Sequence, residues 1–374
     1  MKKLLVVAAL TMAAAPAAMA SKARVSALAG SRQVLDFQTA FDRPYQFMAL
    51  GSQATIEWGA ADTKTAPTGP GTGTFAAANP HAEGGFLMKS DDMAYGAYLG
   101  RRSTAFNDAV AAAVDSGITN LMTEQNPINL YYASKMGEWT WGVTVKYSNG
   151  KDEVADISGT GLVEAKASSM GLAVGASNGT FDVELVQGLT GKTERGDASV
   201  ESKGMTQIGF GYHINENMEA YAQYGMVKAD ITDGNAANDF TYDRTGYAVG
   251  FVNTVSKTED ANFFYGIAYE SGKIKDVAEQ SMLPVWMGIE ANATSWMVLR
   301  ASVKQNILIN ETKVSAANDA KVDVDSIAFN AGLGFKLGKG MLDASFGTAN
   351  QGHLSFSDGT ADKFLSNVAY TYNF

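Results

Sequence analysis

The last eleven residues of the chain, FLSNVAYTYNF at positions 364–374, indicate its fold class most directly. Alternate positions carry large apolar side chains, and these are Phe364, Val368, Tyr370, Tyr372 and Phe374. The positions between them are small or polar, namely Asn367, Ala369, Thr371 and Asn373. Position 366, where the apolar series would continue, is Ser. Because successive side chains of a β-strand point to opposite faces, this stretch predicts a strand with one apolar and one polar face.

The same alternation recurs further upstream. Between positions 139 and 147 one face is apolar and consists of Trp139, Trp141, Val143, Val145 and Tyr147. The opposite face of that segment consists of Thr140, Gly142, Thr144 and Lys146. Similar segments occupy 218–226, 263–270, 297–303 and 327–336. Strands of a soluble β-sandwich alternate in the same way as strands of a membrane β-barrel. The lengths of the connections between strands are therefore needed to distinguish a sandwich from a barrel.

The connections alternate between short turns and long polar loops. We predict about sixteen strands, near 53–60, 83–90, 93–101, 127–134, 138–147, 167–175, 179–188, 202–214, 218–228, 242–254, 261–270, 282–291, 294–304, 324–337, 340–347 and 364–374. Short turns at one end and long loops at the other are typical of antiparallel transmembrane β-barrels, which have short periplasmic turns and long extracellular loops. The sequence therefore predicts an all-β barrel at residues 53–374. The count falls to fourteen if the weak hairpin at 83–101 does not form.

Composition agrees with a barrel and excludes other classes. Only 18% of the 374 residues are charged, against about 25% in soluble proteins. Mean hydropathy is −0.09, and positions 21–374 contain no apolar run of about 18 residues, so no transmembrane helix is predicted there. The net charge of −10 argues against nucleic-acid binding. The absence of Cys excludes disulfides, thiol nucleophiles and iron–sulfur clusters.

The first fifty-two residues have a different character. Lys2 and Lys3 precede an apolar stretch, and Ala18-Met19-Ala20 matches a small-x-small cleavage site. This pattern predicts a cleaved signal peptide at residues 1–20, with an N-terminal membrane anchor as the alternative. Residues 21–52 are too long for a simple leader to the first strand and carry apolar side chains that need cover. We expect them to plug the periplasmic mouth or to lie along the base of the barrel.

The C-terminal strand resembles that of bacterial outer-membrane β-barrel proteins, which typically end in alternating apolar residues and a terminal Phe. The resemblance implies that Tyr370, Tyr372 and Phe374 form an assembly signal read by the barrel-assembly machinery. It also implies a location in bacterial outer-membrane lipid. A closer similarity, to the porin-like major outer-membrane proteins of predatory Bdellovibrio-type bacteria, is carried by three segments. They are Arg24-Val25-Ser26-Ala27-Leu28, Asp42-Arg43-Pro44-Tyr45 and Glu57-Trp58-Gly59.

Aromatic residues cluster near the predicted short turns. Seven of them are expected to form a membrane girdle at the periplasmic end: Trp139, Trp141, Tyr212, Phe263, Tyr265, Trp296 and Phe335. Tyr147 and Tyr269 lie toward the long-loop ends. The alternative is that these aromatics belong to the core of a soluble protein.

If the apolar face contacts lipid, the polar face lines the lumen. Ten charged residues on that face are predicted to line a pore: Glu57, Lys146, Asp182, Glu184, Glu219, Glu270, Glu290, Arg300, Lys336 and Asp343. Sixteen strands enclose a lumen wide enough for water, and the acidic excess predicts a modest preference for cations. The alternative is that some of these groups pair to brace a plug.

A short helix is predicted within one of the long loops. Residues 106–117 are rich in Ala, with Asn107 as the expected N-cap and Gly117 beyond the C-terminal end. So short a helix needs a surface to pack on. It either folds into the lumen and narrows the pore or covers the loops from outside.

Possible catalytic motifs are weak. Residues 175–179, GASNG, match the G-x-S-x-G nucleophile elbow, but strands flank both sides and Asn178-Gly179 is a preferred type I′ hairpin pair. His81, His213 and His353 lie in or beside connections that do not provide a Ser/His pair. The acidic stretch at 230–243 lacks the EF-hand spacing. The sequence therefore predicts no enzyme activity, no metal site and no cofactor.

Three functions are compatible with these features. The first is an outer-membrane porin for passive diffusion of small hydrophilic solutes and ions, with a homotrimer possible by analogy with general porins. The second is a substrate-specific channel, such as FadL-like uptake of hydrophobic molecules past an N-terminal plug. The third is a structural or adhesive surface barrel. An apolar lumen favours the second function, and a blocked lumen with ordered loops favours the third.

Overall fold

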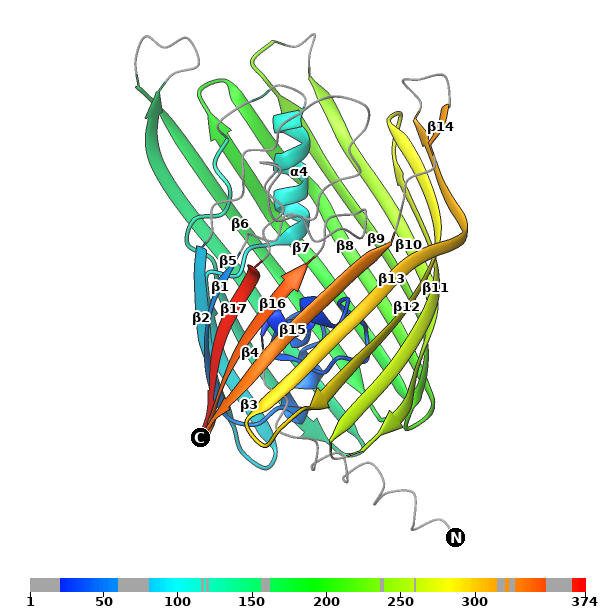
Figure 1. Cartoon of the computed structure of the whole chain (residues 1–374). Helices are drawn as coiled ribbons and strands as arrows, with labels where there is room; N and C mark the ends of the chain where they lie inside the picture. The colour runs from blue at the N-terminus through cyan, green and yellow to red at the C-terminus, as the bar shows by residue number, and fades with distance from the viewer. Residues whose placement is uncertain are drawn as a thin grey trace.

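The chain forms a closed antiparallel β-barrel that contains helical inserts (Figure 1). The computed structural model describes residues 21–59, 81–115, 118, 121–155, 162–235, 239–258, 260–314, 320–322, 327–347 and 365–374. The predicted signal peptide at 1–20 lies outside the described residues, as do Gly117, His353 and most of the loops predicted at 61–82 and 348–363.

Sixteen strands make up the ring, as the sequence predicts. Their bounds are β1 Gln53–Gly59, β2 His81–Lys89, β3 Met93–Leu99, β4 Ile128–Met136, β5 Trp139–Ala155, β6 Leu162–Ser177, β7 Phe181–Arg195, β8 Ala198–Asn215, β9 Met218–Thr232, β10 Phe240–Lys257, β11 Ala261–Ile274, β12 Ala278–Asn292, β13 Met297–Val314, β15 Ala328–Leu337, β16 Gly340–Gly347 and β17 Leu365–Asn373. The weak hairpin at 83–101 is formed as β2 and β3, so the fourteen-strand alternative is wrong.

The barrel closes between its first and last strands. β1 pairs antiparallel with both β2 and β17, and its pairing with β17 runs from Gln53↔Asn373 to Gly59↔Asn367. The three-residue strand β14, Ala320–Val322, pairs with residues 312–314 at the end of β13. β15 pairs with the first half of β13, at residues 297–304. β14 therefore extends the same side of β13 and is not counted as a separate strand of the ring.

Side chains alternate between the outer and inner faces as expected. Along β4, Leu130 and Tyr132 are 51% and 37% exposed, whereas Tyr131 and Ala133 are 4% and 0% exposed. Six of the seven predicted girdle residues, all except Phe335, are similarly exposed. Phe335 is half-buried because its ring stacks on that of Trp296 at a centroid distance of 5.9 Å. A girdle role for these residues remains a prediction.

Nine consecutive strands are longer than a membrane requires. β5 has 17 residues and β8, β10 and β13 have 18 each, which corresponds to about 55–60 Å of strand, whereas the apolar band of an outer-membrane barrel is about 25 Å tall. The sequence underestimated these strands at their long-loop ends. Among the described residues, no helix is both long and apolar enough to cross a membrane.

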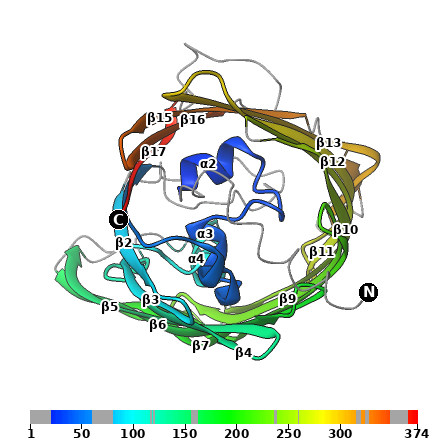
Figure 2. The same cartoon turned by 90° about the horizontal axis from the view of Figure 1, so that it is seen from below.

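Residues 21–50, here called the lumenal segment, lie inside the barrel at the short-turn end (Figure 2). They contain helix α2, Lys22–Ala27, helix α3, Phe37–Ala40, and the 3-10 helix η2, Pro44–Ala49. Local capping explains two of these elements, because the Ser21 side chain accepts the Arg24 N–H and Asp36 forms a capping box with Thr39.

The predicted loop helix is also inside the barrel. α4 spans Thr104–Asp115 and packs on the inner faces of β7, β8 and β9 (Figures 1 and 2). The prediction that Asn107 caps this helix is wrong. The helix begins three residues earlier, and the Asn107 N–H donates to the Ser103 carbonyl oxygen at 3.2 Å. An Asn inside the first turn resembles an N-cap in the sequence alone.

Candidate functional site

The lumenal segment is anchored by a cluster of aromatic rings. Phe37 and Phe41 are fully buried and their ring centroids lie 5.5 and 5.0 Å from that of Tyr98 on β3. Phe47 stacks on Tyr131 of β4 at 4.3 Å. Such aromatic pairs contribute about 0.5–1.5 kcal/mol each beyond the area they bury. The cluster therefore fixes the segment to the wall formed by β3 and β4.

A buried arginine binds the segment to the next part of the wall. Arg32 donates from Nη1 to Oε1 of Glu184 on β7 at 2.8 Å, and from Nε to Oε1 of Glu219 on β9 at 2.5 Å. Its guanidinium also lies 5.2 Å from the ring centroid of Tyr221. Arg32, Glu184 and Glu219 are each less than 10% exposed. Two carboxylates of the predicted pore lining thus neutralise one cation of the lumenal segment.

The far side of the lumen carries a second buried network. Arg24 of α2 donates to Oε2 of Glu290 on β12 at 2.8 Å and lies 3.3 Å from Oδ2 of Asp36. Arg300 of β13 donates to the same Glu290 oxygen at 2.6 Å and to Oδ1 of Asp343 on β16 at 2.6 Å. The lumenal segment is consequently tied to opposite sides of the ring.

Asp42 provides a third attachment. Lys146 on β5 donates to its Oδ1 at 2.7 Å, and Arg101 lies 3.5 Å from its Oδ2. Burial alone would raise the pKa of Asp42, but the two cations outweigh this effect and lower the pKa to about 2. Asp42 is therefore ionised throughout the physiological range.

The structure brings most of the predicted pore-lining residues together around the lumenal segment. Six contact it directly: Glu57, Lys146, Glu184, Glu219, Glu290 and Asp343. Arg300 reaches it through Glu290 and Asp343. The remaining three lie elsewhere, with Asp182 bonded to His213, Glu270 3.8 Å from Lys304, and Lys336 bonded to Asn292. A pore-lining role for the ten residues remains a prediction.

Glycines in the wall allow the segment to approach closely. A Cβ at Gly142 on β5 would lie 2.5 Å from the carbonyl carbon and oxygen of Pro44. A Cβ at Gly332 on β15 would lie 2.7 Å from the Cβ of Ala27. The wall is therefore shaped for the segment at two separate places.

α4 forms a second layer above the lumenal segment. Its residues Phe106, Ala109, Val110 and Ala113 are buried against inward-facing apolar side chains of the wall. Those wall residues are Ala198, Val200, Ala229, Ile231 and Tyr242. This part of the lumen is lined by apolar side chains, in contrast to the ion pairs below it.

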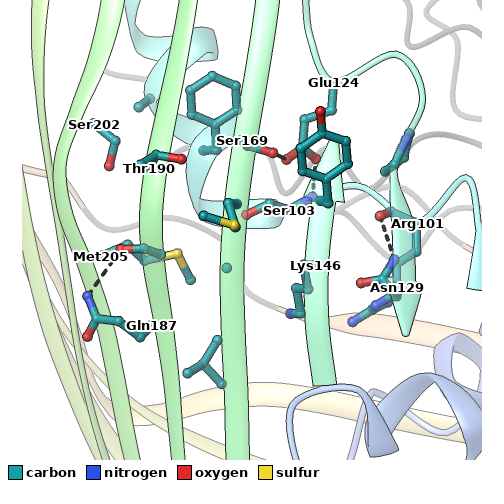
Figure 3. A pocket seen from close by; sticks show the side chains of 18 of the residues that line it. Arg101, Ser103, Glu124, Asn129, Lys146, Ser169, Gln187, Thr190, Ser202 and Met205 are labelled. Carbon is teal, nitrogen blue, oxygen red and sulfur yellow. Dashed lines mark hydrogen bonds between the residues drawn. The ribbon is translucent and has the colours of Figure 1, made fainter. Parts of the chain in front are cut away.

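A cavity of about 30 Å³ lies between α4 and strands β5–β9 (Figure 3). Its apolar lining includes Phe106, Ala109, Val186, Met205, Val227 and Ala229, and its polar lining includes Ser103, Glu124, Lys146, Gln187, Thr190 and Ser202. Glu124 is 2% exposed and accepts hydrogen bonds from Ser169 Oγ and the Ser103 N–H. The cavity holds about two or three water molecules, so a larger molecule requires its lining to move.

The sequence analysis missed the residues of the lumenal segment that bind the wall. Arg24, Arg32 and Asp42 are charged residues within a mostly apolar stretch, and this was the available signal. Their partners outside the segment are between 59 and 266 positions away, which a local pattern does not reveal. Glu124 was missed because it lies outside any alternating segment.

One cluster has the composition of a metal site. Single ligand atoms of Asp182, His213 and Glu219 lie within 4.8 Å of one another. The guanidinium of Arg32 already provides a cation to Glu219, and the His213 ring is bonded to Asp182 at 2.8 Å. These contacts account for the cluster without a metal ion.

The G-x-S-x-G motif forms a hairpin. β6 ends at Ser177 and β7 begins at Phe181, and Ser177 Oγ accepts the Gly179 N–H at 3.2 Å. Gly179 has φ +81°, a value that favours glycine in this turn. The motif therefore lacks the strand-to-helix elbow of a hydrolase, as expected from the flanking strands.

No protein-family model and no curated protein matches the chain. Solved structures with a similar architecture include the Pseudomonas putida toluene transporter TodX, at TM-score 0.41 and 10% identity over 95% of this chain and 98% of that one. A Pseudomonas aeruginosa FadL homologue has a TM-score of 0.45 and 12% identity, over 95% of this chain and 99% of that one. OmpT of Vibrio cholerae has a TM-score of 0.34 and 12% identity, over 86% of this chain and 98% of that one. Likenesses at this level do not assign a function.

The class of the protein follows from its own geometry. All sixteen ring strands are paired on both sides, so the backbone has no open edge that lipid would leave unsatisfied. Large apolar side chains are exposed all around the outer surface, for example Leu130, Ile208, Val249 and Leu299. Charged and polar side chains are instead gathered inside. The chain therefore has the fold of a transmembrane β-barrel.

Proposed function

We propose that the barrel is a gated, substrate-selective channel for small, predominantly apolar molecules, which is the FadL-like alternative of the sequence analysis. The observation that carries this proposal is the occupied lumen. The lumenal segment is tied to β3, β4, β7, β9, β12 and β16. The surface of the cavity next to it is mostly apolar, although polar and apolar side chains line it in about equal number.

An open porin fits the same geometry less well. Free diffusion of ions requires a continuous aqueous path and charges that face it. Here Glu184, Glu219 and Asp343 are less than 10% exposed and hold the lumenal segment in place. Their charges are neutralised by buried arginines, so they provide neither the path nor the cation preference of an open lumen.

The cavity lining indicates the chemistry of the transported molecule. Ligand sites are typically apolar with a few placed polar groups that orient the ligand. Apolar side chains from α4, β7, β8 and β9 supply the first feature, while Glu124 and Lys146 supply the second. We therefore infer a substrate with a small apolar body and one polar end. Its entry requires displacement of α4 or of the lining side chains.

Transport into proteoliposomes tests this proposal. We expect small apolar probes such as indole to enter faster than through protein-free membranes, and sugars of similar size to be excluded. Met205→Trp should fill the cavity and reduce indole uptake about tenfold. Ile208→Trp is the matched control, because Ile208 is on the same strand and 52% exposed on the outer face.

Two outcomes contradict the proposal. Stable ohmic conductance together with size-dependent sugar uptake assigns the open porin instead. Absence of uptake and of indole binding, with folding verified by a heat-dependent gel shift, leaves the structural or adhesive barrel.

A further inference from the structure

Ser21 is the first residue after the predicted cleavage site, and it is completely buried inside the barrel. Its backbone nitrogen lies 3.1 Å from Oδ2 of Asp36 in the lumenal segment. Its hydroxyl donates to Oδ2 of Asp343 on β16, also at 3.1 Å. Both polar groups at this end of the segment are thus held by carboxylates.

The surroundings of Ser21 are strongly acidic. The network of contacts that includes Ser21, here called the Ser21 site, contains the buried carboxylates Asp36, Glu57, Glu83, Glu290 and Asp343. The cations that pair with these carboxylates are Lys22, Arg24 and Arg300. Arg101 reaches the edge of this network through Gln38 but pairs with Asp42. Among the described residues, the Ser21 site therefore contains five carboxylates and three cations.

An excess of buried carboxylate is costly unless another positive charge is supplied. Hydrolysis of the Ala20–Ser21 bond supplies one. The water hydroxyl is added to the Ala20 carbonyl carbon, and the Ser21 nitrogen leaves as an amine that takes up a proton near neutral pH. The new ammonium would occupy the position of the present amide nitrogen, within hydrogen-bond distance of Asp36.

We propose that the Ser21 site is a binding site for the α-ammonium group created by signal-peptide cleavage. The lumenal segment is then held more tightly in the processed chain than in the unprocessed one. The site recognises an amine that is tethered to the segment, and a charge-assisted hydrogen bond of this kind is about twice as strong as that of a neutral amide.

Two further observations agree with an ammonium at this place. With a neutral amide at Ser21, burial raises the pKa of Asp36 to about 6, as expected for a carboxylate that lacks part of its compensating charge. The N–H groups of Ser21 and Lys22 already point at the carboxylates of Asp36 and Glu57, so the site needs no rearrangement to accept the charge.

The site is also selective for chain length. Adding one residue before Ser21 would move the terminal nitrogen by about 3.8 Å, the spacing of consecutive Cα atoms. The ammonium of such a chain would then no longer lie within hydrogen-bond distance of Asp36, where the Ser21 nitrogen is. This inference does not depend on the transported molecule.

The experiment compares three forms of the mature chain in the same detergent: one that begins at Ser21, one with a Gly inserted before Ser21, and one that is Nα-acetylated. Ser31→Cys serves as a reporter in all three, because the chain has no other Cys and Ser31 is 4% exposed. The rate at which maleimide labels this thiol measures how often the lumenal segment detaches from the barrel wall and exposes residue 31. A heat-dependent gel shift verifies barrel folding in each form.

We expect the two altered forms to be labelled at least tenfold faster than the Ser21 form. Asp36→Asn removes the partner of the ammonium, so it should accelerate labelling of the Ser21 form. The difference in labelling rate between the Ser21 form and the acetylated form should then largely disappear. Equal labelling rates in all three folded forms would overturn the proposal. A mature N-terminus at a residue other than Ser21, found by mass spectrometry of the exported protein, would also overturn it.

Discussion

Nη1 of Arg32 donates to Oε1 of Glu184 across 2.8 Å, joining the lumenal segment to strand β7 within the barrel. The same guanidinium binds Glu219 on β9, and Nε of Arg43 lies 3.8 Å from Oε2 of Glu184, so two arginines face the two buried carboxylates. Removing one partner of a buried ion pair typically costs about 3–5 kcal/mol, because the other charge remains buried and unpaired.

Arg32→Ala is therefore expected to unseat the lumenal segment without opening the ring. Labelling of the Ser31→Cys reporter should increase at least a hundredfold, while the heat-dependent gel shift stays unchanged. Lys339→Ala, at an exposed turn, is the control and should leave labelling as in the parent. Unaltered labelling in Arg32→Ala would show that the ion pairs do not hold the segment.

Gly142→Ala tests the close approach of β5 to the segment. The added Cβ would lie 2.5 Å from the Pro44 backbone, so the segment must shift, and overpacking of this kind costs about 1–3 kcal/mol. We expect roughly tenfold faster reporter labelling. Gly225→Ala is the matched control, because the nearest atom to its Cβ is 4.0 Å away. Equal behaviour of the two variants would contradict the predicted contact.

Phe37→Ala tests the aromatic cluster. Phe37 is fully buried among four aromatic rings, and truncation of such a residue typically costs about 3–5 kcal/mol. Limited proteolysis should then cut within residues 21–50, whereas the parent resists. Phe181→Ala, on the outer face and 41% exposed, should not change the cleavage pattern. Cleavage in both variants would indicate a general loss of stability instead.

Seating, the equilibrium binding of the lumenal segment to the barrel wall, should depend differently on pH in the acetylated and in the processed chain. With a neutral amide at Ser21, as in the acetylated chain, burial raises the pKa of Asp36 from its ordinary value of 3.8 to about 6. The seated state then binds more protons than the unseated state between these values, so seating weakens as pH rises from about 4 to 6. Lys22, Arg24, Glu57 and Asp343 face the same site and are common to both chains.

In the processed chain the ammonium should lower the pKa of Asp36 and have its own pKa raised by the surrounding carboxylates. Its contribution is therefore complete below about pH 8, the ordinary α-amino value, and is lost only at higher pH. Reporter labelling, corrected for thiol ionisation, should therefore depend less on pH between about 4 and 6 in this chain than in the acetylated chain. The same pH dependence in both chains would contradict the assigned role of the amine.

The ring of strands could be predicted because its signal is local. The alternation from Trp139 to Tyr147 reports directly which side chains contact lipid and which face inward. The alternation between apolar and polar side chains ends where both faces of the strand become polar. Lys151, Asp152 and Glu153 continue β5 beyond the membrane, where lipid no longer selects apolar side chains, so the predicted strand stopped too early.

The contents of the lumen could be predicted only in outline. The apolar side chains of residues 21–52 indicated that the segment needs cover, but not which wall provides it. Arg32 and Glu184 are 152 positions apart, and only the closed ring brings them together. α4 was predicted to exist, whereas its place inside the barrel depends on Val200 and Ile231, which come from two later strands.

α2 packs on β15, β16 and β17, and Ser21 is bonded to Asp343, 322 positions later in the sequence. Contacts of such high sequence separation form late during folding, because a long loop has to close first. Helix α2 cannot find its binding surface before the final hairpin has joined the ring. Helix α2 is therefore synthesised before every strand of the ring but is among the last elements to reach its native position, and it docks only when the barrel is complete.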